Sequence, residues 1–332
     1  MEDISKIINL KYDWNGQTSG DRTLSEALKI SLNEGREVEK FNSHRHSAHQ
    51  IIASAKQAIS IDNIVDALGD AQTELVAKLG IVRAIHSAEK QSHFFKETHE
   101  RSNEIDLRKF GSTWYSHLTK IICENRKRED ISNIFENLSF VSFNYDRCLE
   151  HYLPKSIANY YGLTEELVQD YVQDLRVHRP YGIAGRLPWQ NSDTAAAPFG
   201  NVRADSLAVA ASEIRTFTQG MGDQDKQSAM HKDLMEAERI VFLGSAFHRQ
   251  NLELLKVRAN PNVEVLATVG GLSASYQRTV KNELAKNFNI RVKENGEKII
   301  LSDMYCEQFF REHWRTLTAD PPSSYSSWVG AI

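Results

Sequence analysis

Apolar residues recur at three- and four-residue steps through the first part of the chain, which is the spacing of one helix face. The residues that set this spacing at the N-terminus are Ile4, Ile7, Ile8 and Leu10. We therefore expect the chain to open on an amphipathic helix rather than a strand. Residues 12–23 are rich in Asn, Gly and Ser and are expected to form a loop. Helical spacing then predominates over about 38–127.

Polar and glycine residues suggest where these helices begin and end. Either Thr23 or Asp21 has a side chain suited to cap the helix that follows the loop. Gly69 and Gly80 are the expected interruptions of the long helical region, because glycine weakens a helix interior.

A different pattern begins near residue 138, where short apolar runs rich in β-branched and aromatic residues alternate with helical stretches. The expected strands are 138–143, 175–182, 239–246, 263–271, 290–293 and 298–301. The expected helices are 155–174, 205–237, 248–258, 273–288 and 302–317. Such alternation is typical of a parallel sheet, so we predict an α/β fold with a Rossmann-like parallel sheet.

The same patterns predict how the chain is divided. We expect a mainly helical subdomain over 24–135 and an α/β core over 136–318, which the N-terminal helix within 1–23 joins. Residues 319–332 form a tail with no element assigned.

Three predicted strands end in residues whose side chains could take part in binding or catalysis. The first ends in Asn144, Tyr145 and Asp146, the second in His178, and the third in the turn Gly244–Ser245. The carboxyl ends of parallel strands meet at one edge of a sheet. An amide, a carboxylate, an imidazole and a small-residue turn are therefore expected to converge there, as in a nucleotide-binding site.

Each of these residues also has a plainer interpretation. Asn144 and Asp146 can simply end the strand and cap the next helix, which is the commoner role of such a pair. His178 can be a general base, but a lone histidine is more often a hydrogen-bonded core residue. The turn at Gly244 and Ser245 lets backbone approach a ligand, although many strand–helix turns look alike.

Composition narrows the range of functions. The 332 residues carry a net charge of −4, which argues against a dedicated nucleic-acid-binding protein. Cys123, Cys148 and Cys306 lie far apart, so we expect a reducing compartment and no paired-cysteine zinc site. No stretch has the roughly 20 apolar residues of a membrane span, and the N-terminus lacks a signal-peptide core. A cytoplasmic location without membrane association is the expectation.

The sequence gives only weak support for a chemical role of three clustered histidines and of Cys148. His44, His46 and His49 lie close together, but no carboxylate or cysteine stands at ligand spacing, so a solvated polar segment is favoured over a metal site. Cys148 has no neighbour that would activate it, so packing is its expected role.

Three motifs together resemble a known family. The segments "VSFNYDRCLEHYL", "VHRPYGIAGRLPW" and "RIVFLGSAFHRQNLELL" are similar, in this order, to the sirtuin-like NAD-binding family, and specifically to its bacterial non-deacetylase branch. "SIDNIVDALGD", "KLGIVRAIHSAE" and "EIRTFTQ" fit the same branch. The resemblance implies cleavage of NAD+ to nicotinamide and ADP-ribose, often in antiviral defence, with a trigger or partner protein.

The resemblance also implies residue roles. "SFNYD" stands where the family has Thr-Gln-Asn-x-Asp, which places Ser142 and Phe143 beside the cofactor. Asn144 would hold the nicotinamide ribose or the attacking water, and Asp146 would support that pocket. His178 would be the catalytic histidine. The residues that would contact phosphate, ribose and adenosine are Gly244, Ser245 and Thr268.

The chain departs from the family pattern at three places. Phe143 replaces the family's glutamine, and the three cysteines cannot build a four-cysteine zinc site, so neither deacylation nor a metal is expected. The strand and Gly-Ala-Gly loop that open the family's fold have no counterpart near Met1, so we expect either a start placed downstream of this element or its loss. The alternative to an enzyme is therefore a catalytically inactive nucleotide-sensing protein or a scaffold subunit that forms homo-oligomers through 38–127.

Overall fold

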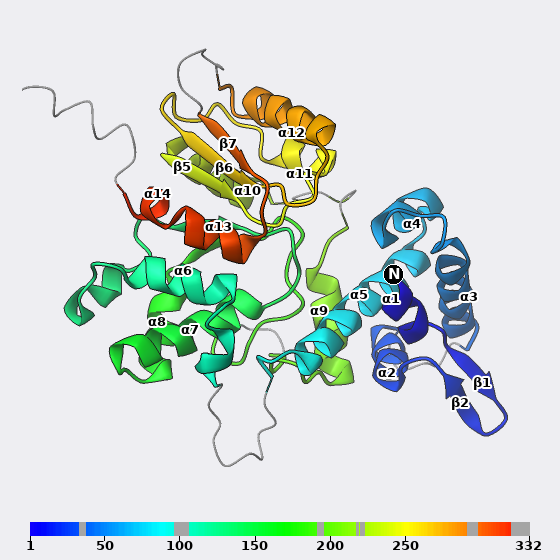
Figure 1. Cartoon of the computed structure of the whole chain (residues 1–332). Coiled ribbons are helices and arrows are strands. Elements are labelled where there is room, and N and C mark those ends of the chain that lie inside the picture. Colours follow the sequence, from blue (N-terminus) through cyan, green and yellow to red (C-terminus); the bar gives the residue numbers. More distant parts are fainter. Residues whose placement is uncertain are drawn as a thin grey trace, which may run out of the picture. The chain divides into compact units, whose positions relative to one another are not determined.

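The structure of the chain is a computed structural model that describes residues 1–32, 38–95, 106–190, 196–216, 219, 223–290 and 298–319 (Figure 1). It is a mixed α/β protein in which helices predominate. The chain divides into two compact units: unit 1 comprises 1–106 and 140–222, and unit 2 comprises 107–139 and 223–332. The expected helical region 24–135 and the expected core 136–318 are each divided between these units. Within the described ranges, no helix is long and apolar enough to cross a membrane.

Unit 1 is mainly helical. Its elements are α1 (Glu2–Ile7), β1 (Lys11–Asp13), β2 (Gly16–Ser19), α2 (Arg22–Ser31), α3 (Val38–Ser54), α4 (Ile61–Leu68), α5 (Ala71–Gln91), α7 (Cys148–Tyr161), α8 (Glu165–Gln173), β4 (Arg176–His178) and α9 (Ala204–Glu213). Strand β3 (Ser139–Val141) lies across the boundary between the two units.

Helix α5 forms the centre of the core of unit 1, where α1, α2, α3, α4 and α9 pack around it. Leu28 of α2, Leu79 of α5 and Leu207 of α9 are fully buried, and each such side chain stabilises the fold by about 1.5–3 kcal/mol. The expected interruption at Gly80 is wrong, because this residue lies within α5. A Cβ there would come within 2.8 Å of the Ile8 side chain, so glycine allows α1 to approach closely.

The start of unit 1 confirms some expectations and corrects another. The predicted amphipathic N-terminal helix is α1, and Asp21 caps α2 by accepting a hydrogen bond from Leu24 N. Gly69 ends α4 in the left-handed conformation, with φ of 64°. The loop expected over 12–23 is instead largely a hairpin of β1 and β2, in which Tyr12 pairs with Gln17.

Unit 2 contains a parallel sheet. Its elements are the 3₁₀ helices Leu107–Phe110 and Arg128–Asn133, α6 (Trp114–Cys123), α10 (Gln224–Glu236), β5 (Arg239–Phe242), α11 (Arg249–Leu254), β6 (Glu264–Thr268), α12 (Ala274–Asn287), β7 (Ile299–Ser302), α13 (Cys306–Glu312) and α14 (Trp314–Thr318). Strands β5, β6 and β7 pair in this order, with Phe242 opposite Ala267 and Thr268 opposite Ser302. Helix α12 packs beside β7, and α13 packs on α6 (Figure 1).

The strands predicted over 138–302 are present where the structure describes them, but they belong to different sheets. β3 pairs with β4, whereas β5, β6 and β7 form a separate sheet. The helix predicted over 155–174 is two helices, α7 and α8, because Gly162 ends α7 in the left-handed conformation. Most of the strand predicted over 290–293 and most of the tail 319–332 lie outside the described residues.

Candidate functional site

The segments that carry Asn144 and His178 lie side by side in unit 1. Ser142 N donates a hydrogen bond of 2.9 Å to His178 O, at the point where β3 and β4 end. Ala184 N donates to Tyr145 O at 2.8 Å, so the two segments remain together beyond the strands. The structure therefore brings the backbone of the predicted motif 142–146 next to that of 178–184.

Arg179 connects these two segments through its side chain. Its Nη1 donates to Asn144 O at 2.8 Å, and its Nε and Nη2 bind the Glu150 carboxylate of α7 at 2.7–3.1 Å. Only 10% of the Arg179 side chain and 7% of the Glu150 side chain are exposed. Such a paired geometry is more rigid than a single contact, so Arg179 fixes the position of Asn144 relative to His178.

The predicted residues of this motif differ in environment. Asn144 is exposed, whereas Ser142, Phe143, Asp146 and His178 are partly buried. The Phe143 ring lies 5.7 Å from the ring of Tyr181. Asp146 is not the N-cap residue of α7, which is Arg147, but its Oδ1 accepts a hydrogen bond from Cys148 N at 3.1 Å. Asp146 thus accepts a hydrogen bond from the first turn of α7, as a capping residue would, but it lies one residue before the N-cap position.

A buried charge cluster that the sequence analysis missed stands directly beside this motif. Arg147 is 0% exposed, and its Nε donates to Glu89 Oε1 of α5 at 2.9 Å. Glu89 Oε2 also accepts from Gly200 N, and Arg147 donates to the carbonyl oxygens of Ala197 and Pro198. These bonds anchor the start of α7, and with it the segment 142–146, to α5 and to residues 197–200.

His86 completes the cluster as a neutral side chain. Its Nε2 donates to Ala184 O at 2.8 Å, and its Nδ1 accepts from Arg147 Nη2 at 3.3 Å. Burial, and then the nearby Arg147 charge, lowers the pKa of His86 to about 3. The signal in the sequence is the spacing of His86 and Glu89, which puts two polar groups three residues apart on the buried face of α5.

Two tyrosines around the motif have structural roles. Tyr145 donates from its hydroxyl to Arg215 O at 2.8 Å, and Arg215 N donates to Tyr181 O. Burial, and then the nearby Asp62 carboxylate, raises the pKa of Tyr181 to about 12 and that of Tyr145 still further. Both hydroxyls therefore stay protonated near neutral pH, and that of Tyr145 serves as a donor rather than a base.

The remaining predicted residues lie in unit 2, at the carboxyl ends of β5 and β6. Gly244 has φ of 59°, and its N–H donates to Thr268 Oγ1 at 2.9 Å. Thr268 Oγ1 in turn donates to Phe242 O, so its hydroxyl joins the ends of the two strands. Ser245 Oγ accepts from Phe247 N at 3.0 Å. The structure thus brings Gly244 and Thr268 together, while Asn144, Asp146 and His178 belong to unit 1.

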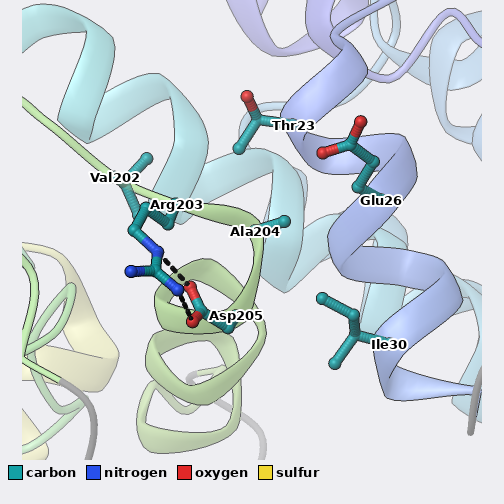
Figure 2. A pocket seen from close by; sticks show the side chains of 7 residues that line it. All are labelled: Thr23, Glu26, Ile30, Val202, Arg203, Ala204 and Asp205. Atoms are coloured by element: carbon teal, nitrogen blue, oxygen red, sulfur yellow. Dashed lines mark hydrogen bonds and ion pairs between the residues drawn. The ribbon is translucent and has the colours of Figure 1, made fainter.

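A depression in unit 1 lies between α2 and the start of α9 and has a volume of 450 Å³ (Figure 2). The residues that line it are Thr23, Glu26, Ile30, Val202, Arg203, Ala204 and Asp205. None of the site residues predicted from the sequence lines this depression.

The histidine group of α3 differs from its expectation. His44 is buried, with Nδ1 bonded to Lys40 O at 2.8 Å, whereas His46 and His49 are exposed. Only part of this segment is therefore solvated. Within the ranges described above, no group of three or more His, Cys, Asp or Glu side chains is arranged to hold a metal ion.

The chain was compared with protein-family models, with curated proteins and with solved structures, and none of them matches it.

Proposed function

We propose that the chain binds NAD+ and hydrolyses it to nicotinamide and ADP-ribose, with the chemical step carried by residues 142–146 and His178 of unit 1. The observation that carries the proposal is the hydrogen bond from Ser142 N to His178 O, which joins the two motifs that most resemble the sirtuin-like family. We extend the proposal to the fold: the parallel β5–β6–β7 sheet with intervening helices is compatible with a sirtuin-like, Rossmann-like core.

The proposed reaction needs positioning and a general base from the protein, but no strong acid. Water attacks C1′ of the nicotinamide ribose, and the N-glycosidic bond breaks with its electron pair moving to the nicotinamide nitrogen, which leaves neutral. The transition state has oxocarbenium character, as in other glycoside cleavage. Asn144 orients the water by hydrogen bonding, and His178 accepts the proton that the water loses. Correct placement of reacting groups supplies a large part of the rate in such steps.

The other predicted residues have supporting roles in this proposal. Asp146 supports the nicotinamide pocket, and Ser142 and Phe143 line it. Gly244, Ser245 and Thr268 lie in unit 2, and their proposed contacts to phosphate, ribose and adenosine rest separately on the resemblance. Thr268→Val is their test: an isosteric side chain that loses the hydroxyl should weaken NAD+ binding. Thr279→Val, at an exposed position of α12 in the same unit, is the matched control and should leave binding unchanged.

The decisive experiment follows free nicotinamide by chromatography after the purified chain is incubated with NAD+. We expect wild type to release nicotinamide and His178→Ala to lose about 10²–10⁴-fold of that rate, the usual contribution of a general base. Asn144→Ala should lose activity as well. His46→Ala removes an exposed histidine of α3 and should match wild type. Wild-type rates in both Asn144→Ala and His178→Ala would refute the assignment.

The same experiment separates the enzyme from its alternative. A chain that binds NAD+ in calorimetry but releases no nicotinamide would be a nucleotide-sensing protein or scaffold subunit, not a hydrolase. A role in antiviral defence rests on the resemblance alone. It predicts that cells carrying wild type survive phage challenge better than cells carrying His178→Ala, and equal survival would contradict it.

A further inference from the structure

The turn between β1 and β2 presents a tryptophan to solvent. Trp14 is 92% exposed, which is unusual for the largest aromatic side chain. Tryptophan is among the residues most enriched at the energetic centres of protein interfaces. The exposure of Trp14 therefore makes the tip of the hairpin a candidate contact site.

The hairpin holds Trp14 on an ordered base. The Tyr12 ring packs edge-on against Phe41 of α3, with centroids 5.7 Å apart, and Arg45 lies over its face at 5.8 Å. The Tyr12 hydroxyl contacts Ser25 Oγ of α2. Asn15 N donates to Asp13 Oδ1 at 2.8 Å and closes the turn. Because these contacts hold the hairpin, binding through Trp14 mainly costs the ordering of its own side chain.

The same unit presents a depression of suitable chemistry, the one between α2 and the start of α9. Ile30, which is 43% exposed, and the side chains of Val202 and Ala204 supply its apolar surface. Figure 2 shows Glu26 and Ile30 on α2, and across from them Arg203, whose guanidinium is paired with Asp205 at 2.7 Å. The depression is shallow and open to solvent, and its volume is 450 Å³.

We propose that Trp14 of one copy of the chain binds in this depression of a second copy. The indole ring matches the apolar surface, and its N–H, which can only donate, matches the Glu26 and Asp205 carboxylates. The Arg203 guanidinium is a suitable partner for the face of an aromatic ring. Trp14 and the depression belong to the same chain, so every copy of the chain provides both surfaces of the contact.

Charge disfavours two other kinds of occupant. The exposed charges beside Trp14 are Lys11 and Asp13, one of each sign. The charged residues that line the depression are Glu26, Asp205 and Arg203. Neither surface has the basic surplus that binds a phosphate backbone or an anionic membrane. A second copy of this chain needs no such surplus.

The contact is small, so the association should be weak and should depend on concentration. A buried tryptophan removes about 150–250 Å² from solvent, whereas a stable interface buries about 800 Å² on each partner. Sedimentation velocity of the full chain over a wide concentration range measures this directly. We expect a wild-type sedimentation coefficient that rises with concentration, and at least about tenfold weaker association for Trp14→Ala, as for an interface hot spot.

Matched variants identify the partner surface. Ile30→Glu places a charge in the depression and should weaken association as much as Trp14→Ala, whereas Tyr305→Ala, at a 75% exposed aromatic of unit 2, should not. The two interface variants are then mixed in equal amounts. The Trp14 of the Ile30→Glu chain meets the intact depression of the Trp14→Ala chain, so pairs should form that neither variant forms alone.

Three results would overturn this proposal. They are a wild-type chain that stays monomeric at all concentrations, a Trp14→Ala chain that associates like wild type, and a mixture that forms no more pairs than its components. Circular dichroism of each variant verifies that it is folded, as expected for substitutions at exposed positions.

Discussion

Arg147 and Glu89 are 58 residues apart in the sequence and form an ion pair that is buried on both sides, with side-chain exposures of 0% and 2%. The pair joins the start of α7 to α5 and so fixes the segment that precedes α7, which contains Asn144 and Asp146. Taking two charges out of water is costly, and the additional bonds from Gly200 N and to Ala197 O and Pro198 O offset that cost.

This ion pair predicts that a single substitution lowers the free energy of unfolding more than its share of a double substitution does. Glu89→Gln leaves the Arg147 charge buried without a counter-ion and should lower the free energy of unfolding by about 3–5 kcal/mol. Glu89→Leu combined with Arg147→Met leaves no buried charge and should cost less than the sum of the single changes. Urea unfolding measures both. Arg203→Gln removes one partner of the exposed pair with Asp205 and should have no measurable effect.

Acid should destabilise unit 1 through the buried His86 and the partly buried His151. Burial, with neighbouring Arg147 for His86 and Lys155 for His151, lowers both pKa values from 6.5 to about 3. Each histidine is neutral in the folded chain between these values but protonated in the unfolded chain, so stability is full above pH 6.5 and falls as the pH drops toward 3. Each contributes about 1.4 kcal/mol per pH unit in this window.

The comparison of variants isolates that contribution. We expect His86→Gln to be less stable than wild type at pH 7, and its unfolding free energy to fall less steeply between pH 6 and about 4. Urea unfolding at successive pH values gives the two slopes. His46→Gln, at an exposed position, should keep the wild-type slope. Equal slopes for His86→Gln and wild type would mean that folding does not lower the pKa of His86.

Gly182 should tolerate no side chain. It follows Tyr181 with φ of 84°, and a Cβ there would lie 2.3 Å from Glu213 O, a backbone atom that cannot rotate away. Gly182→Ala should therefore cost at least about 2 kcal/mol, combining left-handed strain with displacement of the 213–215 segment. Thermal unfolding measures the loss. Gly111→Ala, where the nearest atom is 3.7 Å away and φ is not positive, is the control.

Arg179 should matter more for the rate of the proposed reaction than for substrate binding. Arg179→Lys keeps the charge but cannot bind Glu150 through two nitrogens and reach Asn144 O at the same time. A displacement of Asn144 by about 1 Å can cost about 10²-fold in rate. We expect kcat for nicotinamide release to fall and KM to change little. A rise in KM at constant kcat would place Arg179 in binding instead.

The pattern of apolar residues was sufficient for most of the secondary structure. Helix α1, the Asp21 cap of α2, the end of α4 at Gly69 and the described strands of the second half all follow from local spacing and local side-chain chemistry, which act within a few residues. The hairpin of β1 and β2 was missed because its residues are turn formers, and Gly80 was misjudged because its role is to let Ile8 approach α5.

Only the tertiary structure showed which long-range hydrogen bonds hold the predicted motifs in place. Local patterns marked Asn144, Asp146 and His178 as candidates. They contained no sign that Arg147 pairs with Glu89 or that Arg179 holds Asn144 O. Those bonds join residues 35–58 positions apart, and only the folded backbone brings such groups within reach. For the same reason the sequence could place Gly244 beside Thr268 only by assuming a sheet, whereas the paired strands β5 and β6 put the Gly244 N–H on the Thr268 hydroxyl.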